Sequence, residues 1–175
     1  MTSSVDLTPD VQHWLRLAGL DMIQGSQTND GRTIIWNSGG EVRNFIDFSD
    51  GWYIITESDR MGPEAFSFAG ASMQIIEKYL YGAFGGVVRG DDLPSVRVPF
   101  DREELYPGYS IGKVLFEGRE RRTLVDHAGK VVAIAAIDRL VELSHYLNVS
   151  IEIIKGSYLA ADGKPLFAVW RDIKN

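Results

Sequence analysis

One stretch, residues 51–72 (GWYIITESDRMGPEAFSFAGAS), constrains the fold of this chain more than any other. It begins with a β-rich run at 52–56, passes through a polar and charged turn, and becomes apolar again at Phe66 and Phe68. Glycine and proline restrict a turn to a few backbone conformations. Since this turn lies between two segments of buried character, we predict a rigid loop that a β-sheet holds out toward solvent.

The rest of the chain predicts an α+β protein with mostly antiparallel sheet built from hairpins, and with about four helices. Strand-like runs joined by short turns lie at 32–36, 41–48, 52–57, 109–116, 119–126 and 131–136. Helices are expected after Thr8, Ser72, Asp138 and Ser150, because each of these residues can cap an apolar periodic segment. We expect Gly82, Gly85 and Gly86 to end the second helix.

Length and composition favour one soluble domain over residues 1–175, with residues 1–7 frayed. The formal net charge of −6 argues against non-specific binding to nucleic acid or to anionic membranes, and is compatible with a basic protein partner. The chain has no cysteine, which excludes disulfides and thiolate metal sites. No secretion signal or membrane-spanning run is recognisable, so a cytoplasmic location is expected.

No set of residues reads as a complete catalytic site, and we expect no enzyme activity, no cofactor and no metal. The chain has three histidines, and His145 follows Ser144 on a predicted helix, where neighbouring side chains diverge by about 100°. An alternative stays open: Asp59, Arg60 and Glu64 could form a charge-linked loop that serves a small-molecule-binding or enzymatic domain. A structural or chaperone-like partner without inhibitory action is a further alternative.

Two segments together carry a family resemblance. They are GWYIITESDR with the following GPE at 62–64, and VELSHYL at 141–147 with the later DGKPLF at 162–167. With them the chain resembles the immunity proteins of bacterial polymorphic toxin systems, and among these it is similar to immunity factors against the tuberculosis necrotizing toxin, a secreted NAD glycohydrolase.

The resemblance implies a cytosolic, non-enzymatic antitoxin that binds its toxin one to one and blocks the NAD-binding cleft. A plug for such a cleft needs a pre-organised loop, because ordering a flexible loop costs affinity. Asp59 and Glu64 could take the places of phosphate charges, and Gly70 and Ala71 are small enough for a narrow site. It is equally open whether Asp59, Arg60 and Glu64 only fix the loop internally. The residues predicted to bind the toxin are Glu57, Ser58, Asp59, Arg60, Met61, Gly62, Pro63, Glu64, Ala69, Gly70, Ala71 and Ser72.

Overall fold

The computed structural model describes residues 4–173, which form four α-helices and ten strands. The helices are α1 (Pro9–Leu17), α2 (Met73–Arg89), α3 (Ile137–Ser144) and α4 (Ile151–Leu159). The strands are β1 (Asp21–Ile23), β2 (Thr33–Trp36), β3 (Val42–Ser49), β4 (Trp52–Asp59), β5 (Ala65–Gly70), β6 (Val96–Arg97), β7 (Ser110–Phe116), β8 (Arg119–Val125), β9 (Val131–Ile134) and β10 (Ala168–Val169). The predicted α+β class is confirmed.

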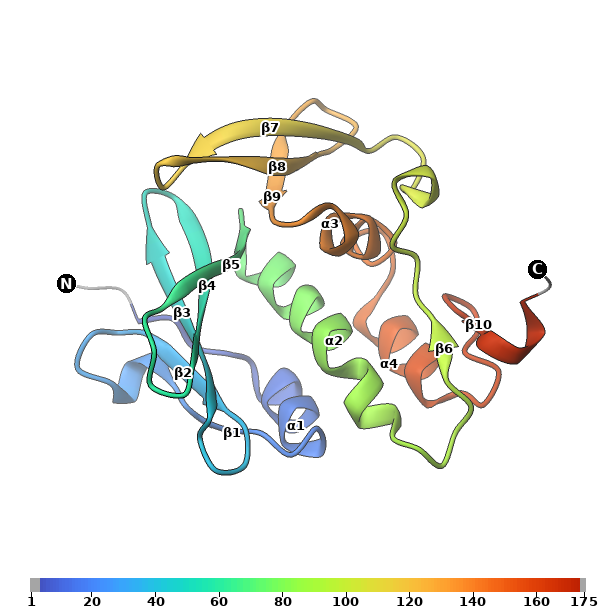
Figure 1. Ribbon diagram of the computed structural model, residues 1–175, viewed down its shortest axis with the longest axis horizontal. Coiled ribbons are helices and arrows are strands. Elements are labelled where there is room, and N and C mark those ends of the chain that lie inside the picture. The colour runs from blue at the N-terminus through green and yellow to red at the C-terminus, as the bar shows by residue number, and fades with distance from the viewer. Residues whose placement is uncertain (1–3, 174–175) are drawn as a thin grey trace. The chain divides into compact units, whose positions relative to one another are not determined.

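The chain divides into two compact units, and the boundary falls inside α2 between Glu77 and Lys78. The first unit contains a five-stranded antiparallel meander in the order β1-β2-β3-β4-β5 (Figure 1). Its strands β2 to β4 match the predicted hairpin run. The short strand β1 was not expected, because three residues are too few to show a clear alternation. The prediction of one domain over residues 1–175 stays a prediction.

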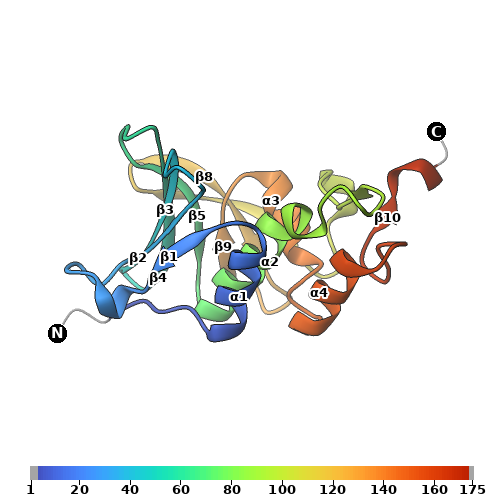
Figure 2. The same ribbon diagram turned by 90° about the horizontal axis from the view of Figure 1, so that it is seen from below.

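One face of this meander forms the core of the first unit. Thr33, Ile46, Ile55 and Phe68 are paired across β2 to β5, and each is at most 1% exposed. Helix α1 lies beside the sheet (Figure 2) and buries its own apolar stripe of Val11, Trp14 and Leu15. Because successive strand residues point to opposite faces, the other face of β1 to β4 carries a separate row of side chains.

The predicted fraying of residues 1–7 is wrong for residues 5–7, and residues 1–3 lie outside the described part of the chain. Val5 and Leu7 are only 3% and 4% exposed. The Val5 backbone N–H donates to the Gly31 carbonyl at 2.9 Å, and its carbonyl accepts from the Gly25 N–H at 3.1 Å. Burial of two apolar side chains and two backbone hydrogen bonds offset the entropy of ordering this segment.

The second unit contains the antiparallel strands β7, β8 and β9, a two-stranded ribbon of β6 and β10, and helices α3 and α4. Most of α2 also belongs to it, and here the predicted helix end is wrong. Gly82, Gly85 and Gly86 lie inside α2, which runs to Arg89. A Cβ on Gly82 would lie 2.4 Å from the Tyr146 ring, and one on Gly85 would lie 2.3 Å from the Tyr158 ring. Two of these glycines are therefore present for close packing and do not end the helix.

Candidate functional site

The predicted rigid loop is the tip of the β4–β5 hairpin, residues 59–64. β4 continues to Asp59, so the irregular part is shorter than predicted. The Gly62 N–H donates to the Asp59 carbonyl at 2.8 Å, and the Ser58 hydroxyl donates to the Gly62 carbonyl at 2.6 Å. The Arg60 N–H donates to the Glu41 carbonyl at 2.7 Å. Three hydrogen bonds around one turn hold its backbone in a single conformation.

The two central residues of this turn adopt a left-handed backbone conformation. Arg60 has φ of 48° and Met61 has φ of 61°. Side chains with a Cβ rarely occupy this region, and hairpin turns that need it usually contain Asn-Gly or Asp-Gly. The β3–β4 hairpin follows that rule with Asp50-Gly51, and the β7–β8 hairpin, with Glu117-Gly118, also has glycine as the second residue of its turn. At the β4–β5 tip an arginine and a 75% exposed methionine stand instead. Turn chemistry does not explain these two residues.

Only one of the three charged residues predicted to be linked at the tip has an internal role. The Glu64 carboxylate accepts from the Arg32 guanidinium at 2.8 Å and from the Thr56 hydroxyl at 2.5 Å. Among residues 4–173 the side chains of Asp59 and Arg60 have no hydrogen-bond or ion-pair partner. The charge-linked Asp59/Arg60/Glu64 set of the small-molecule alternative is therefore not formed, whereas Asp59 and Arg60 are available to a partner.

A depression of about 370 Å³ lies at the base of the tip. Its lining contains two carboxylates, those of Glu57 and Asp59, beside Gly62, Pro63, Ala65, Phe66 and Ser67. Like Asp59, Glu57 has an exposed side chain that makes no hydrogen bond or ion pair with the described residues. The tip thus presents unpaired negative charge on a fixed backbone, next to the positive charge of Arg60.

The second predicted segment, residues 69–72, is mostly structural. Ala69 and Gly70 belong to β5 and are buried, and a Cβ on Gly70 would lie 3.0 Å from Ile75 Cγ2. Ser72 caps α2, since its hydroxyl accepts from the Ile75 N–H at 3.3 Å. A buried residue offers no surface to a partner, so Ala69 and Gly70 are removed from the predicted contact surface. Ala71 and Ser72 are half-buried and remain candidates.

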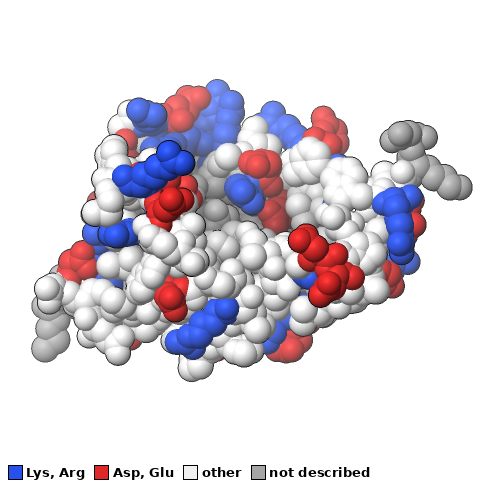
Figure 3. All heavy atoms as spheres, turned by 60° about the horizontal axis from the view of Figure 1, so that its bottom comes forward, with Lys and Arg blue, Asp and Glu red and all other residues white. Residues whose placement is uncertain are grey.

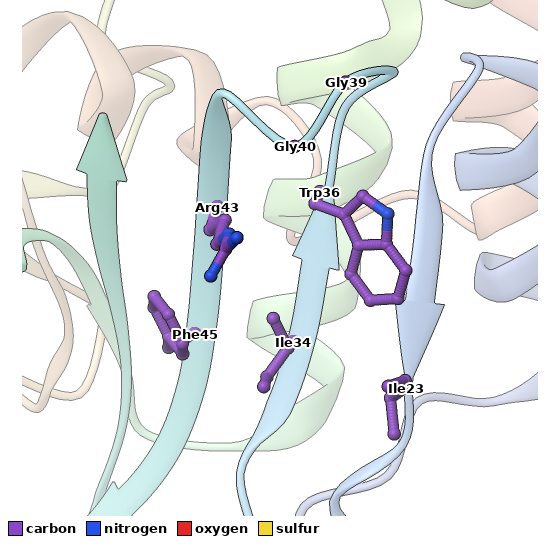
Figure 4. A pocket seen from close by; sticks show the side chains of 7 residues that line it. All are labelled: Ile23, Ile34, Trp36, Gly39, Gly40, Arg43 and Phe45. Carbon is purple, nitrogen blue, oxygen red and sulfur yellow. The ribbon is translucent and has the colours of Figure 1, made fainter. Parts of the chain in front are cut away.

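A groove that the sequence did not predict lies on the outer face of β1 to β3 (Figure 4). Its volume is about 530 Å³, and it is lined by Ile23, Ile34, Trp36, Gly39, Gly40, Arg43 and Phe45. One signal was present in the sequence: Phe45 is out of register with Val42, Ile46 and Phe48, which indicates a strand with apolar side chains on both faces.

The face shown in Figure 3 carries both acidic and basic side chains. Close to the tip, a hydrogen bond from Arg32 lowers the pKa of Asp30.

Within residues 4–173 no three His, Asp or Glu side chains gather as metal ligands do. None of the described helices is long and apolar enough to cross a membrane.

Comparison with known proteins identifies the family. The sequence model of immunity protein 61 matches residues 14–166. The chain belongs to this family of immunity proteins. The Mycobacterium tuberculosis (strain ATCC 25618 / H37Rv) protein named "Immunity factor for TNT" is 63% identical over 175 residues, which cover 99% of each chain. The homologue from Mycobacterium bovis (strain BCG / Pasteur 1173P2) gives the same values. A solved structure described as "Rv3902c from M. tuberculosis" shares 62% identity with a TM-score of 0.95, covering 98% of this chain and 99% of that one.

Membership in an immunity protein family confirms the resemblance read from the sequence and makes this chain an antitoxin and not an enzyme. The function of an immunity protein is to bind a toxin. The β4–β5 tip has exposed charged side chains on a backbone that hydrogen bonds hold in place.

Proposed function

We propose that this immunity protein binds and inhibits a toxin related to TNT in the cytoplasm of the cell that makes it. The observation that carries the proposal is 63% identity along the whole chain to a protein named as the immunity factor for TNT. Following the resemblance, we take the toxin to be an NAD-hydrolysing enzyme, the complex to be one to one, and inhibition to result from occlusion of the NAD-binding cleft.

The inhibitory surface in this proposal is the β4–β5 tip, residues 59–64, with the adjoining Glu57 and with Ala71 and Ser72; Ser58 is excluded because it is only 6% exposed. Two properties support it. The backbone is fixed by hydrogen bonds before binding, which lowers the entropy cost of association. The Glu57 and Asp59 carboxylates are unpaired and exposed, so they can meet cationic groups that hold phosphate oxygens in an NAD site. In addition, Arg60 and Met61 have a left-handed backbone conformation, and such strained residues are concentrated at binding sites.

The test is an NAD-hydrolysis assay with the purified TNT-like toxin of the same organism. Adding the immunity protein should reduce NAD loss in proportion and abolish it near equimolar ratio, while titration calorimetry gives the stoichiometry. Undiminished hydrolysis at equimolar ratio would reject the proposed function.

A charge reversal separates the tip from the rest of the surface. Asp59→Arg should weaken inhibition by about tenfold or more, since it replaces an anion by a cation at the interface. Asp91→Arg is the matched control, because Asp91 is also an exposed aspartate, in a loop far along the chain. If both variants inhibit as wild type does, the toxin binds elsewhere.

A further inference from the structure

The groove on the outer face of β1 to β3 has the composition of a binding surface. Cross-strand pairing brings Ile23, Ile34 and Phe45 into one row and places Trp36 opposite Arg43 (Figure 4). Ile23 is 40% exposed, and the other lining side chains are half-buried. Tryptophan and arginine are the residues most often found at the energetic centres of protein interfaces.

Two hydrogen-bond donors in the groove are unused. Among the described residues, neither the Arg43 guanidinium nor the Trp36 indole has a hydrogen-bond, ion-pair or ring partner. Arg32 on the same face provides a contrast, because it pairs with Asp30 and Glu64 and its guanidinium lies 4.7 Å from the Phe45 ring centre. A guanidinium has only donors, and its planar fork fits a carboxylate. The groove therefore fits a ligand that has a hydrogen-bond acceptor next to apolar atoms.

The groove is also continuous with the hairpin tip. Arg43 pairs in register with Ser58, whose hydroxyl holds Gly62 of the turn. Phe45 connects to the tip through Arg32, which binds Glu64. A stable protein interface covers about 800 Å² on each partner, which is more than one six-residue hairpin tip offers. A toxin seated on the tip must cover neighbouring surface, and the groove is apolar surface of this kind.

We propose that this groove is a second docking surface for the toxin and that it takes a toxin segment presenting an Asp or Glu carboxylate beside an apolar side chain. The carboxylate pairs with Arg43, the indole N–H of Trp36 donates to a neighbouring acceptor, and the apolar side chain packs on Ile34 and Phe45. The inference rests on the proposed function, because the occupant is the toxin that the protein inhibits. The partly desolvated position of Arg43 strengthens such a pair compared with one in open solvent.

The test uses the full chain and the TNT-like toxin, with the dissociation constant from calorimetry. Arg43→Gln should weaken binding by about tenfold and Arg43→Glu by more, whereas Arg43→Lys should retain part of the affinity. This order follows the charge at position 43, which a packing role would not produce. Trp36→Ala should weaken binding by a similar factor. Arg16→Glu, an exposed arginine on α1 of the same unit, is the control and should bind as wild type.

The outcomes separate the two proposals. If wild type inhibits the toxin and all Arg43 and Trp36 variants bind like wild type, the docking groove is refuted while the proposed function stands. If wild type fails to bind the toxin, both fail. Sedimentation of the free protein covers a further possibility: self-association that Arg43→Glu abolishes, with toxin affinity unchanged, would assign the groove to a second copy of this chain and overturn the inference.

Discussion

Replacing Arg60-Met61 at the β4–β5 tip by Asn-Gly should stabilise the fold and weaken toxin binding at the same time. Both residues lie in the left-handed region, with φ of 48° and 61°, which costs roughly 1–2 kcal/mol for each ordinary residue. Asn tolerates this conformation and Gly removes the clash, although Gly loses about 0.5–1 kcal/mol in extra chain entropy.

The net gain in the free energy of unfolding is then about 1 kcal/mol, which corresponds to roughly 2–4 °C in Tm for a chain of this size. The Arg60 N–H that donates to Glu41 is kept. The removed side chains make no internal hydrogen bond or ion pair within residues 4–173, and Met61 is 75% exposed. Loss of their contacts should appear as weaker inhibition of NAD hydrolysis.

The reverse exchange provides the matched control. Asp50→Arg with Gly51→Met places the same pair in the β3–β4 turn, where φ is 52° and 82°. It should lower the Tm by a comparable amount and leave inhibition unchanged. An Asn-Gly variant that is less stable than wild type would refute the backbone argument, and one that inhibits as well as wild type would remove Arg60 and Met61 from the toxin contact.

Three further predictions concern the second unit, and denaturant unfolding measures all of them. Gly85→Ala should destabilise by about 1–3 kcal/mol through overlap with the Tyr158 ring, while Gly86→Ala, whose Cβ meets nothing within 4 Å, should stabilise by up to about 1 kcal/mol; equal effects would contradict the packing role. Burial raises the pKa of Glu142 above its ordinary value of 4.5. The protonated Glu142 side chain therefore contributes its full share of wild-type stability below pH 4.5, and this share is lost as the pH rises through the folded-state pKa. The stability advantage of Glu142→Gln over wild type, measured as the free energy of unfolding, should grow with pH. The hydrogen bond from Arg97 lowers the pKa of Glu104 to about 2, so Glu104→Gln should destabilise at neutral pH, and this deficit should disappear between pH 4.5 and 2; a deficit independent of pH would exclude the ion pair.

The sequence predicted the fold correctly where residues close together in the chain determine the local structure. The apolar spacing of Val11, Trp14 and Leu15 gave α1, and short turns gave the meander. The same local rule failed for α2, because Gly85 usually indicates a helix end. Here its role depends on the Tyr158 ring, which comes from a helix far along the chain. A contact between residues so far apart in the chain cannot be predicted from one sequence.

The candidate site, too, was predictable where local sequence determines it and not where distant contacts do. Glycine and proline between two apolar runs predicted the hairpin tip, but not which of its charges are free. That depends on Arg32, which lies directly before β2 and pairs with Glu64, whereas Asp59 stays unpaired among the described residues. The small residues Ala69 and Gly70 resembled a loop, yet they are buried in β5. The groove requires the register of three strands, which no local pattern contains.

The tip and the groove differ physically, so they should affect different steps of toxin binding. Exposed charge at an interface mainly governs the association rate and its dependence on salt, whereas desolvated anchors govern dissociation. The Asp59 carboxylate is exposed at the tip, and Trp36 is half-buried among apolar side chains. In stopped-flow or biosensor kinetics, Asp59→Arg should therefore reduce the association rate most strongly at low salt. Trp36→Ala should accelerate dissociation with little salt dependence. If Asp59→Arg instead accelerates dissociation and Trp36→Ala instead reduces the association rate, the toxin buries the tip and makes only peripheral contact with the sheet. The groove would then not be an anchor of the complex.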